Sequence, residues 1–143
     1  MDGLPYKSVN CFYHYKSNFS FIGTTSGLAY YSNEKISELS SVEQLKNQTI
    51  RCITSDSKNN LWIGTDNGII LLNKTENGFT YKESIEAIDG QELGYTYGLA
   101  VDKNDALWIA TSQMGLFHYF NGKAEHYTAP NQLISNLYHL YGQ

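Results

Sequence analysis

Residues 60–68 read NLWIGTDNG, an apolar and β-branched run that ends in a polar turn closed by glycine. Two other segments resemble it: residues 106–115 read ALWIATSQMG, and residues 19–27 read FSFIGTTSG. A shift of 46 residues places Trp62 on Trp108, and a shift of 41 in the other direction brings the first segment into the same register. Because two independent shifts give one register, the chain contains three copies of one repeat, which indicates an array of similar structural units.

Each copy predicts four short strands separated by turns. In the second copy the runs IRCITSD, LWIGT, IILLN and FTYKE are separated by SKNN, DNG and KTENG. Apolar, β-branched and aromatic runs bounded by Asn, Asp and Gly are typical of β-hairpins. Four antiparallel strands every 41–46 residues is the period of a β-propeller blade. We therefore predict an all-β fold, a partial β-propeller in one domain, 1–143, with blades near 9–45, 50–90 and 96–130 and the start of a fourth near 135–143.

The turns are consistent with this reading. The residue before the second strand tolerates a left-handed backbone in every copy (Asn18, Asn59 and Asp105). The next turn closes on a glycine, for which a positive φ costs little (Gly27, Gly68 and Gly115). The third copy has one extra residue in this turn, Met114, which predicts a longer or bulged hairpin.

The run DSKNNLWIGTDNG, residues 56–68, resembles the two-component regulator propeller repeat, whose pattern ends in Gly-Asn-Leu-Trp-Ile-Gly-Thr and a Gly turn. The resemblance is strong in the second and third copies and weaker in the first, where Phe21 replaces the Trp. The chain departs from the pattern at Asn59 and Asp105, where the family has Gly, and at Ala110, which replaces the second Gly. We interpret Ala110 as a sign that no ligand approaches the backbone closely there.

The resemblance implies a function and a set of partners. Such propellers have about seven blades and form the extracytoplasmic part of hybrid sensor kinases, many of which sense oligosaccharides. Three blades and the start of a fourth do not close a ring, and an open arc exposes blade faces and strand edges. We therefore expect a fragment of a larger propeller, or a protomer that completes one by self-association, in a periplasmic or extracellular location.

Composition excludes several classes of protein. The net charge is −4, only one of the ten basic residues is an arginine, and no basic stripe is present, so a nucleic-acid partner is not expected. No apolar run is long enough for a membrane span, and the N-terminus lacks the features of a signal peptide, which leaves a cytoplasmic location open. No CxxC pair is present.

Several residues have both a structural and a functional interpretation. Trp62 and Trp108 could stack against a sugar, but their shared repeat position favours packing within or between blades. The segments 56–60 and 102–105 are similar to calcium loops, but each contains a Lys and lacks the Glu at the twelfth position. We expect hairpin turns in which an Asp side chain accepts local N–H groups.

The cysteines and histidines offer no recognisable site. Cys11 and Cys52 occupy equivalent positions in neighbouring blades, and we favour small buried thiols over a disulfide. The four histidines show no metal-binding spacing, and no motif of nucleophilic or phosphate chemistry is present. We predict no cofactor, no metal site and no catalytic residue.

Function is best sought where the copies differ. Residues 89–98, DGQELGYTYG, link the second and third blades, and loops on one face are where repeat proteins place binding sites. We expect ligand contacts from this link and from the hairpin tips (Gln91, Glu92, Tyr95, Asp66, Asn67 and Gln113). The leading hypothesis is a sensory, ligand-recognition module without enzymatic activity. The alternatives are a propeller enzyme of the lyase type, which needs a His/Glu pair with a metal, and a passive protein-interaction scaffold.

Overall fold

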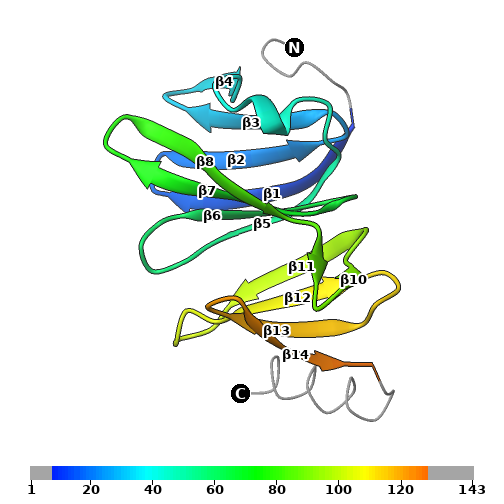
Figure 1. Ribbon diagram of the computed structural model, residues 1–143. Coiled ribbons are helices and arrows are strands. Elements are labelled where there is room, and N and C mark those ends of the chain that lie inside the picture. The colour runs from blue at the N-terminus through cyan, green and yellow to red at the C-terminus, as the bar shows by residue number, and fades with distance from the viewer. Residues whose placement is uncertain (1–7, 129–143) are drawn as a thin grey trace.

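The computed structural model describes residues 8–128, so the predicted start of a fourth blade lies outside the described residues. This part of the chain forms three four-stranded antiparallel sheets, each with its strands in chain order, and one small two-stranded sheet. The sheets follow one another through the molecule from the N-terminal to the C-terminal side (Figure 1). The prediction of three four-stranded propeller blades is confirmed.

The strands have the following bounds. Blade 1 contains β1 (Val9–Lys16), β2 (Phe19–Thr24), β3 (Gly27–Ser32) and β4 (Lys35–Glu38). Blade 2 contains β5 (Ile50–Ser55), β6 (Leu61–Thr65), β7 (Gly68–Thr75) and β8 (Gly78–Ile85). Blade 3 contains β11 (Thr96–Val101), β12 (Leu107–Thr111), β13 (Leu116–Phe120) and β14 (Lys123–Tyr127).

The links between blades carry short elements of their own. A 3-10 turn, η1 (Glu43–Leu45), lies between blades 1 and 2, and the hairpin of β9 (Ala87–Ile88) with β10 (Gln91–Glu92) lies between blades 2 and 3. Each link buries apolar side chains against the sheets, Leu45 in the first and Leu93 in the second. The links are therefore anchored to the blades that they join.

The core consists of two junctions between neighbouring blades. Along a strand, alternate side chains point to opposite faces of the sheet, so each blade contributes to the junction on either side. Phe21 of blade 1 and Ile63 of blade 2 pack in the first junction, and both are fully buried. Trp62 of blade 2 and Ile109 of blade 3 pack in the second junction. This confirms packing for Trp62, whereas Trp108 stacks on His118 outside both clusters.

Glycine in the Trp-Ile-Gly-Thr run allows neighbouring blades to approach. A Cβ at Gly23 would lie 2.5 Å from the Cys11 sulfur and 2.7 Å from Ile50 Cγ2 of the next blade. A Cβ at Gly64 would lie 2.4 Å from the Cys52 sulfur and 3.0 Å from the backbone oxygen of Thr96. The glycine at this position therefore serves blade packing.

The predicted turn conformations are confirmed with one exception. Asn59 and Asp105 have φ values of 69° and 62°, as expected. Asn18 does not have a positive φ. The connection also differs in length: β1 continues to Lys16, which pairs with Phe19, so residues 17–18 form a two-residue turn where blade 2 has a longer loop between β5 and β6.

The loop-closing glycines and the aspartates also behave as predicted. The extra residue in blade 3 lengthens the second hairpin, and the hydrogen bond from the Thr111 hydroxyl to the Gly115 carbonyl accordingly spans four residues. The corresponding bond from Thr65 to Gly68 spans three residues. Asp56 and Asp102 each accept two backbone N–H groups of their own turns. Cys11 and Cys52 are free thiols.

Candidate ligand-binding site

The antiparallel order of the strands divides the loops between two faces. Because successive strands run in opposite directions, the second hairpin of each blade and the links between blades lie at one end of the strands. We call this end the link face, and it carries residues 39–49, 66–67, 86–95 and 112–114. The first and third hairpins form the opposite face, which we call the hairpin face. All six predicted contact residues belong to the link face.

A cluster around Arg51 connects two of the predicted residues. Arg51 Nε donates to Asp66 Oδ1 at 2.6 Å, and its Nη2 lies 3.3 Å from Asp66 Oδ2, which makes the ion pair bidentate. The guanidinium carbon lies 5.5 Å from the centre of the Tyr95 ring, within the range of a cation–π contact. The hydrogen bond to Asp66 raises the pKa of Arg51. Arg51 therefore fixes both Asp66 and Tyr95.

Two exposed tyrosines form the aromatic part of this cluster. The Tyr95 side chain is 48% exposed and the Tyr97 side chain 54%. The Tyr95 carbonyl accepts the Ser112 N–H at 3.0 Å, and the Gly94 carbonyl accepts the Gly68 N–H at 2.9 Å. The link is thus tied to the second hairpins of blades 2 and 3, which holds Tyr95 between them.

The other predicted residues lie on the same face without a side-chain bond among the described residues. Gln91 and Glu92 are exposed in β10, and Asn67 and Gln113 are exposed at the tips of the second hairpins. The sequence did not lead to a prediction that Arg51 belongs to the site. The one feature that could have indicated it is that Arg51 is the single arginine of the chain.

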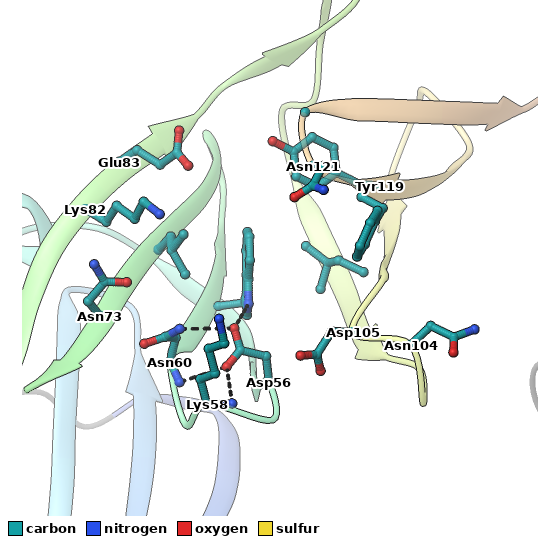
Figure 2. A pocket seen from close by; sticks show the side chains of 15 residues that line it. Asp56, Lys58, Asn60, Asn73, Lys82, Glu83, Asn104, Asp105, Tyr119 and Asn121 are labelled. Carbon is teal, nitrogen blue, oxygen red and sulfur yellow. Dashed lines mark hydrogen bonds between the residues drawn. The ribbon is translucent and has the colours of Figure 1, made fainter.

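A cleft opens on the hairpin face between blades 2 and 3 (Figure 2). Its volume is about 660 Å³. Asp56, Asn60, Asn73 and Glu83 of blade 2 line one side, and blade 3 supplies residues of its first and third hairpins (Asn104, Asp105, Tyr119 and Asn121). No sequence pattern had indicated this cleft, because its two walls come from different repeats.

Asp56 organises the edge of the cleft. Its Oδ1 accepts the N–H groups of Lys58 and Asn60, and its Oδ2 accepts the Asn60 side-chain amide and the Trp62 indole N–H, at 3.0–3.3 Å. Across the junction, Asp105 accepts both the N–H and the hydroxyl of Ser57. The two first hairpins are therefore joined by hydrogen bonds at the mouth of the cleft.

The acidic and histidine side chains of residues 8–128 can be compared with the needs of a metal site. No group of three or more His, Cys, Asp and Glu side chains in this range could hold a metal ion. His118 lies 3.3 Å from both Asp102 and Glu125, and its ring stacks on Trp108 at 4.1 Å. In the same range no helix is long and apolar enough to cross a membrane.

The four-stranded blades, their shared register and the packing of blade on blade define a segment of a β-propeller. Residues 44–67 match the family model described as two component regulator propeller, so the predicted resemblance is confirmed. A crystal structure of the extracellular domain of BT3049 from B. thetaiotaomicron, assigned as a hybrid two component system, is similar in fold, with a TM-score of 0.63 and 23% sequence identity. The match covers 91% of this chain and 17% of that one, so the chain spans a small part of its length. None of the curated proteins compared with this chain matches it.

Proposed function

We propose that this chain is part of the ligand-sensing propeller of a hybrid two-component regulator, on the extracytoplasmic side, and that its ligand is an oligosaccharide. The match of residues 44–67 to the regulator propeller model supports the class. The fold shared with an extracellular domain of that kind supports the location.

The cluster of Arg51, Asp66 and Tyr95 carries the proposal for the site. An exposed tyrosine offers an apolar ring face and a polar hydroxyl, which suits the alternating apolar and polar surface of a sugar. The bidentate ion pair between Arg51 and Asp66 fixes polar groups beside that ring. Because these side chains are already held in place, binding costs little side-chain entropy.

The link face also suggests how binding is transmitted. Tyr95 lies in the link between blades 2 and 3, and its carbonyl is bonded to the second hairpin of blade 3. A ligand that contacts Tyr95 and Asp66 touches blade 2 and the link that is bonded to blade 3. It would favour one relative arrangement of the blades, and such a differential affinity shifts a conformational equilibrium.

Calorimetric titration with a panel of oligosaccharides tests the link-face site. We expect heat of binding for at least one oligosaccharide with the wild-type chain. The affinity of Tyr95→Ala should be lower by about twofold to tenfold, since one good aromatic contact is worth about 0.5–1.5 kcal/mol. Tyr81→Ala is the matched control, because Tyr81 is an exposed tyrosine on β8 of blade 2. Equal binding by wild type and Tyr95→Ala would remove the link from the site.

We further propose that the outer face of blade 1 packs against another blade of the same kind, supplied by a longer parent chain or by a second copy. Phe12 is 65% exposed and Tyr31 is 41% exposed on this face. Phe12 pairs with Ile22 on adjacent strands, as Ile53 pairs with Ile63 in the first junction. Gel filtration distinguishes the two sources, because a stable monomer of 16.2 kDa would exclude self-association.

A further inference from the structure

We propose that the cleft between blades 2 and 3 is a second binding site, for an uncharged polyhydroxylated ligand of the size of a mono- or disaccharide. It opens on the hairpin face, at the opposite end of the strands from Tyr95, so it does not depend on the link-face site. Its volume of about 660 Å³ lies within the range of small-molecule sites.

Unpaired amides supply the polar contacts of the cleft. Among residues 8–128, the side chains of Asn73, Asn104 and Asn121 make no hydrogen bond, and all three line the cleft. Figure 2 shows Asn73 on the side of blade 2 and Asn121 on the side of blade 3, whereas the Asn104 side chain points away from blade 2 at the edge of the cleft. Each amide has two donors and one acceptor oxygen, which matches hydroxyl groups that also donate and accept.

The charges of the cleft favour a neutral ligand. Two lysines and three carboxylates line it (Lys58, Lys82, Asp56, Glu83 and Asp105). The carboxylates of Asp56 and Asp105 are already occupied by hydrogen bonds from the turns. The two lysines offset two of the three carboxylates, so the small net charge of the lining favours neither a strongly anionic nor a strongly cationic group.

Two aromatic rings give the cleft an apolar side. Trp62 and Tyr119 line it, with ring centroids 6.4 Å apart and planes at 71°. The Trp62 indole N–H is bonded to Asp56, which fixes the ring. Fixed aromatic rings beside amides are the combination that a sugar ring needs, because it has both C–H faces and hydroxyl edges.

Comparison with the first junction shows that the abundance of amides is particular to the second. In the first junction, Tyr15 stands at the repeat position of Asp56, and its ring packs against Phe21 at 5.4 Å and Phe79 at 5.8 Å. The cleft beside these rings is lined by aromatic side chains and by the third hairpin of blade 2, and it contains one asparagine, Asn77. The cleft between blades 2 and 3 is lined by four asparagines (Asn60, Asn73, Asn104 and Asn121).

Nuclear magnetic resonance with the 143-residue chain tests the proposal. The chain has two tryptophans, so it gives two indole N–H signals, one in the cleft and one on the outer face of blade 3; Trp108→Phe assigns them. The probes are glucose, galactose, mannose, xylose, maltose and cellobiose. We expect at least one sugar to shift the Trp62 signal with concentration and to leave the Trp108 signal in place.

Variants decide whether the named amides are responsible. Asn73→Ala/Asn121→Gly should weaken the binding about tenfold or more, because two hydrogen bonds are lost; glycine suits the positive φ of Asn121. If the double variant does not fold, Asn121→Gly alone, in an exposed turn, should weaken it about threefold or more. Asn77→Ala is the matched control, since Asn77 is exposed and lies outside this cleft.

Several results would overturn the proposal. It fails if no sugar shifts the Trp62 signal, if the amide variants bind as the wild type does, or if galacturonate binds more tightly than galactose. Tyr95→Ala separates the two sites: this variant should keep the full response of Trp62. Loss of that response in Tyr95→Ala would contradict a separate site on the hairpin face, whereas loss of calorimetric binding alone would concern only the link face.

Discussion

Gly64→Ala should destabilise the protein strongly, because this position lies where two blades meet. The added methyl would lie 2.4 Å from the Cys52 sulfur of its own blade, and 3.0 Å and 3.1 Å from the backbone oxygen and the Cγ2 of Thr96 in the next. Carbon and sulfur atoms do not approach as closely as 2.4 Å without displacement of one of them. The Cys52 side chain would have to leave its position or β5 would have to move, and β11 would have to yield slightly at Thr96.

Blade 3 contains the natural compensation for this change. There Ala110 takes the place of Gly64, and Gly98 takes the place of Cys52 on the paired strand. In blade 3 the side chain between the two strands is therefore the methyl group of Ala110 on β12, and β11 contributes none at Gly98. A Cβ at Gly98 would have one described atom within 4 Å, the Ala110 Cβ at 3.4 Å. Cys52→Gly/Gly64→Ala therefore gives blade 2 the pair found in blade 3.

The magnitudes follow from the distances. Overpacking a core costs about 1–3 kcal/mol, and three contacts at or below 3.1 Å place Gly64→Ala near the upper end. At about 3 °C per kcal/mol for a chain of this length, the Tm should fall by roughly 8 °C. Cys52→Gly alone should cost about 1–2 kcal/mol through lost packing and a more flexible backbone. The double variant should be more stable than the sum of the two by about 1 kcal/mol or more.

Urea denaturation followed by circular dichroism measures all three variants. Gly98→Ala is the control, because the same substitution on the inner strand of blade 3 meets only an ordinary contact and should change the free energy of unfolding by about 1 kcal/mol or less. A Gly64→Ala variant as stable as the wild type would refute the packing argument. Strict additivity in the double variant would refute the role of the Cys52 sulfur.

Three further predictions concern ionisable groups. Asp56→Ala removes the acceptor of four hydrogen bonds and should lower the free energy of unfolding by about 2–4 kcal/mol; an unchanged urea midpoint would contradict this. Burial raises the pKa of the Cys11 thiol to about 11 and that of Cys52 to about 12. Iodoacetamide at neutral pH should therefore label both slowly in the folded chain and faster in urea, and equal rates would argue against the burial. Burial alone would raise the pKa of Asp102, but hydrogen bonds from Ala106, Asn104 and His118 lower it overall. Its contribution to stability is therefore complete above its ordinary pKa of 3.8 and is lost as the pH falls through the lowered value, so Asp102→Asn should lose less stability on acidification than the wild type does.

The elements of each blade could be predicted from the sequence because they depend on local signals. Alternating apolar residues, a left-handed Asn59 or Asp105 and a glycine at Gly68 or Gly115 specify strands and turns within one repeat. Asn18 differs because β1 extends two residues further than the repeat suggested and shortens the turn.

The site could be predicted only in part, because side chains from distant residues meet through the packing of blades. Asp66 and Tyr95 were predicted separately, but the Arg51 that joins them lies on an inner strand with no loop signal. The hydrogen bonds from Ser57 to Asp105 span 48 residues and depend on how blade 3 is placed against blade 2. The sequence pattern of one repeat does not determine how two blades are placed against each other. The cleft beside these hydrogen bonds could therefore be identified only from the three-dimensional structure.

The close approach of neighbouring blades at Gly23 and Gly64 has a consequence for the exchange of blades between such proteins by recombination. Ile50, the first residue of blade 2, packs against Gly23 of blade 1, and its carbonyl accepts a hydrogen bond from the Asn10 side chain. Thr96, the first residue of blade 3, packs against Gly64 of blade 2 in the same way. A recombination event that cuts at the sequence boundary between repeats would separate each glycine from the residue that covers it. A unit that keeps this glycine contact is therefore one blade together with the first residue of the next inner strand.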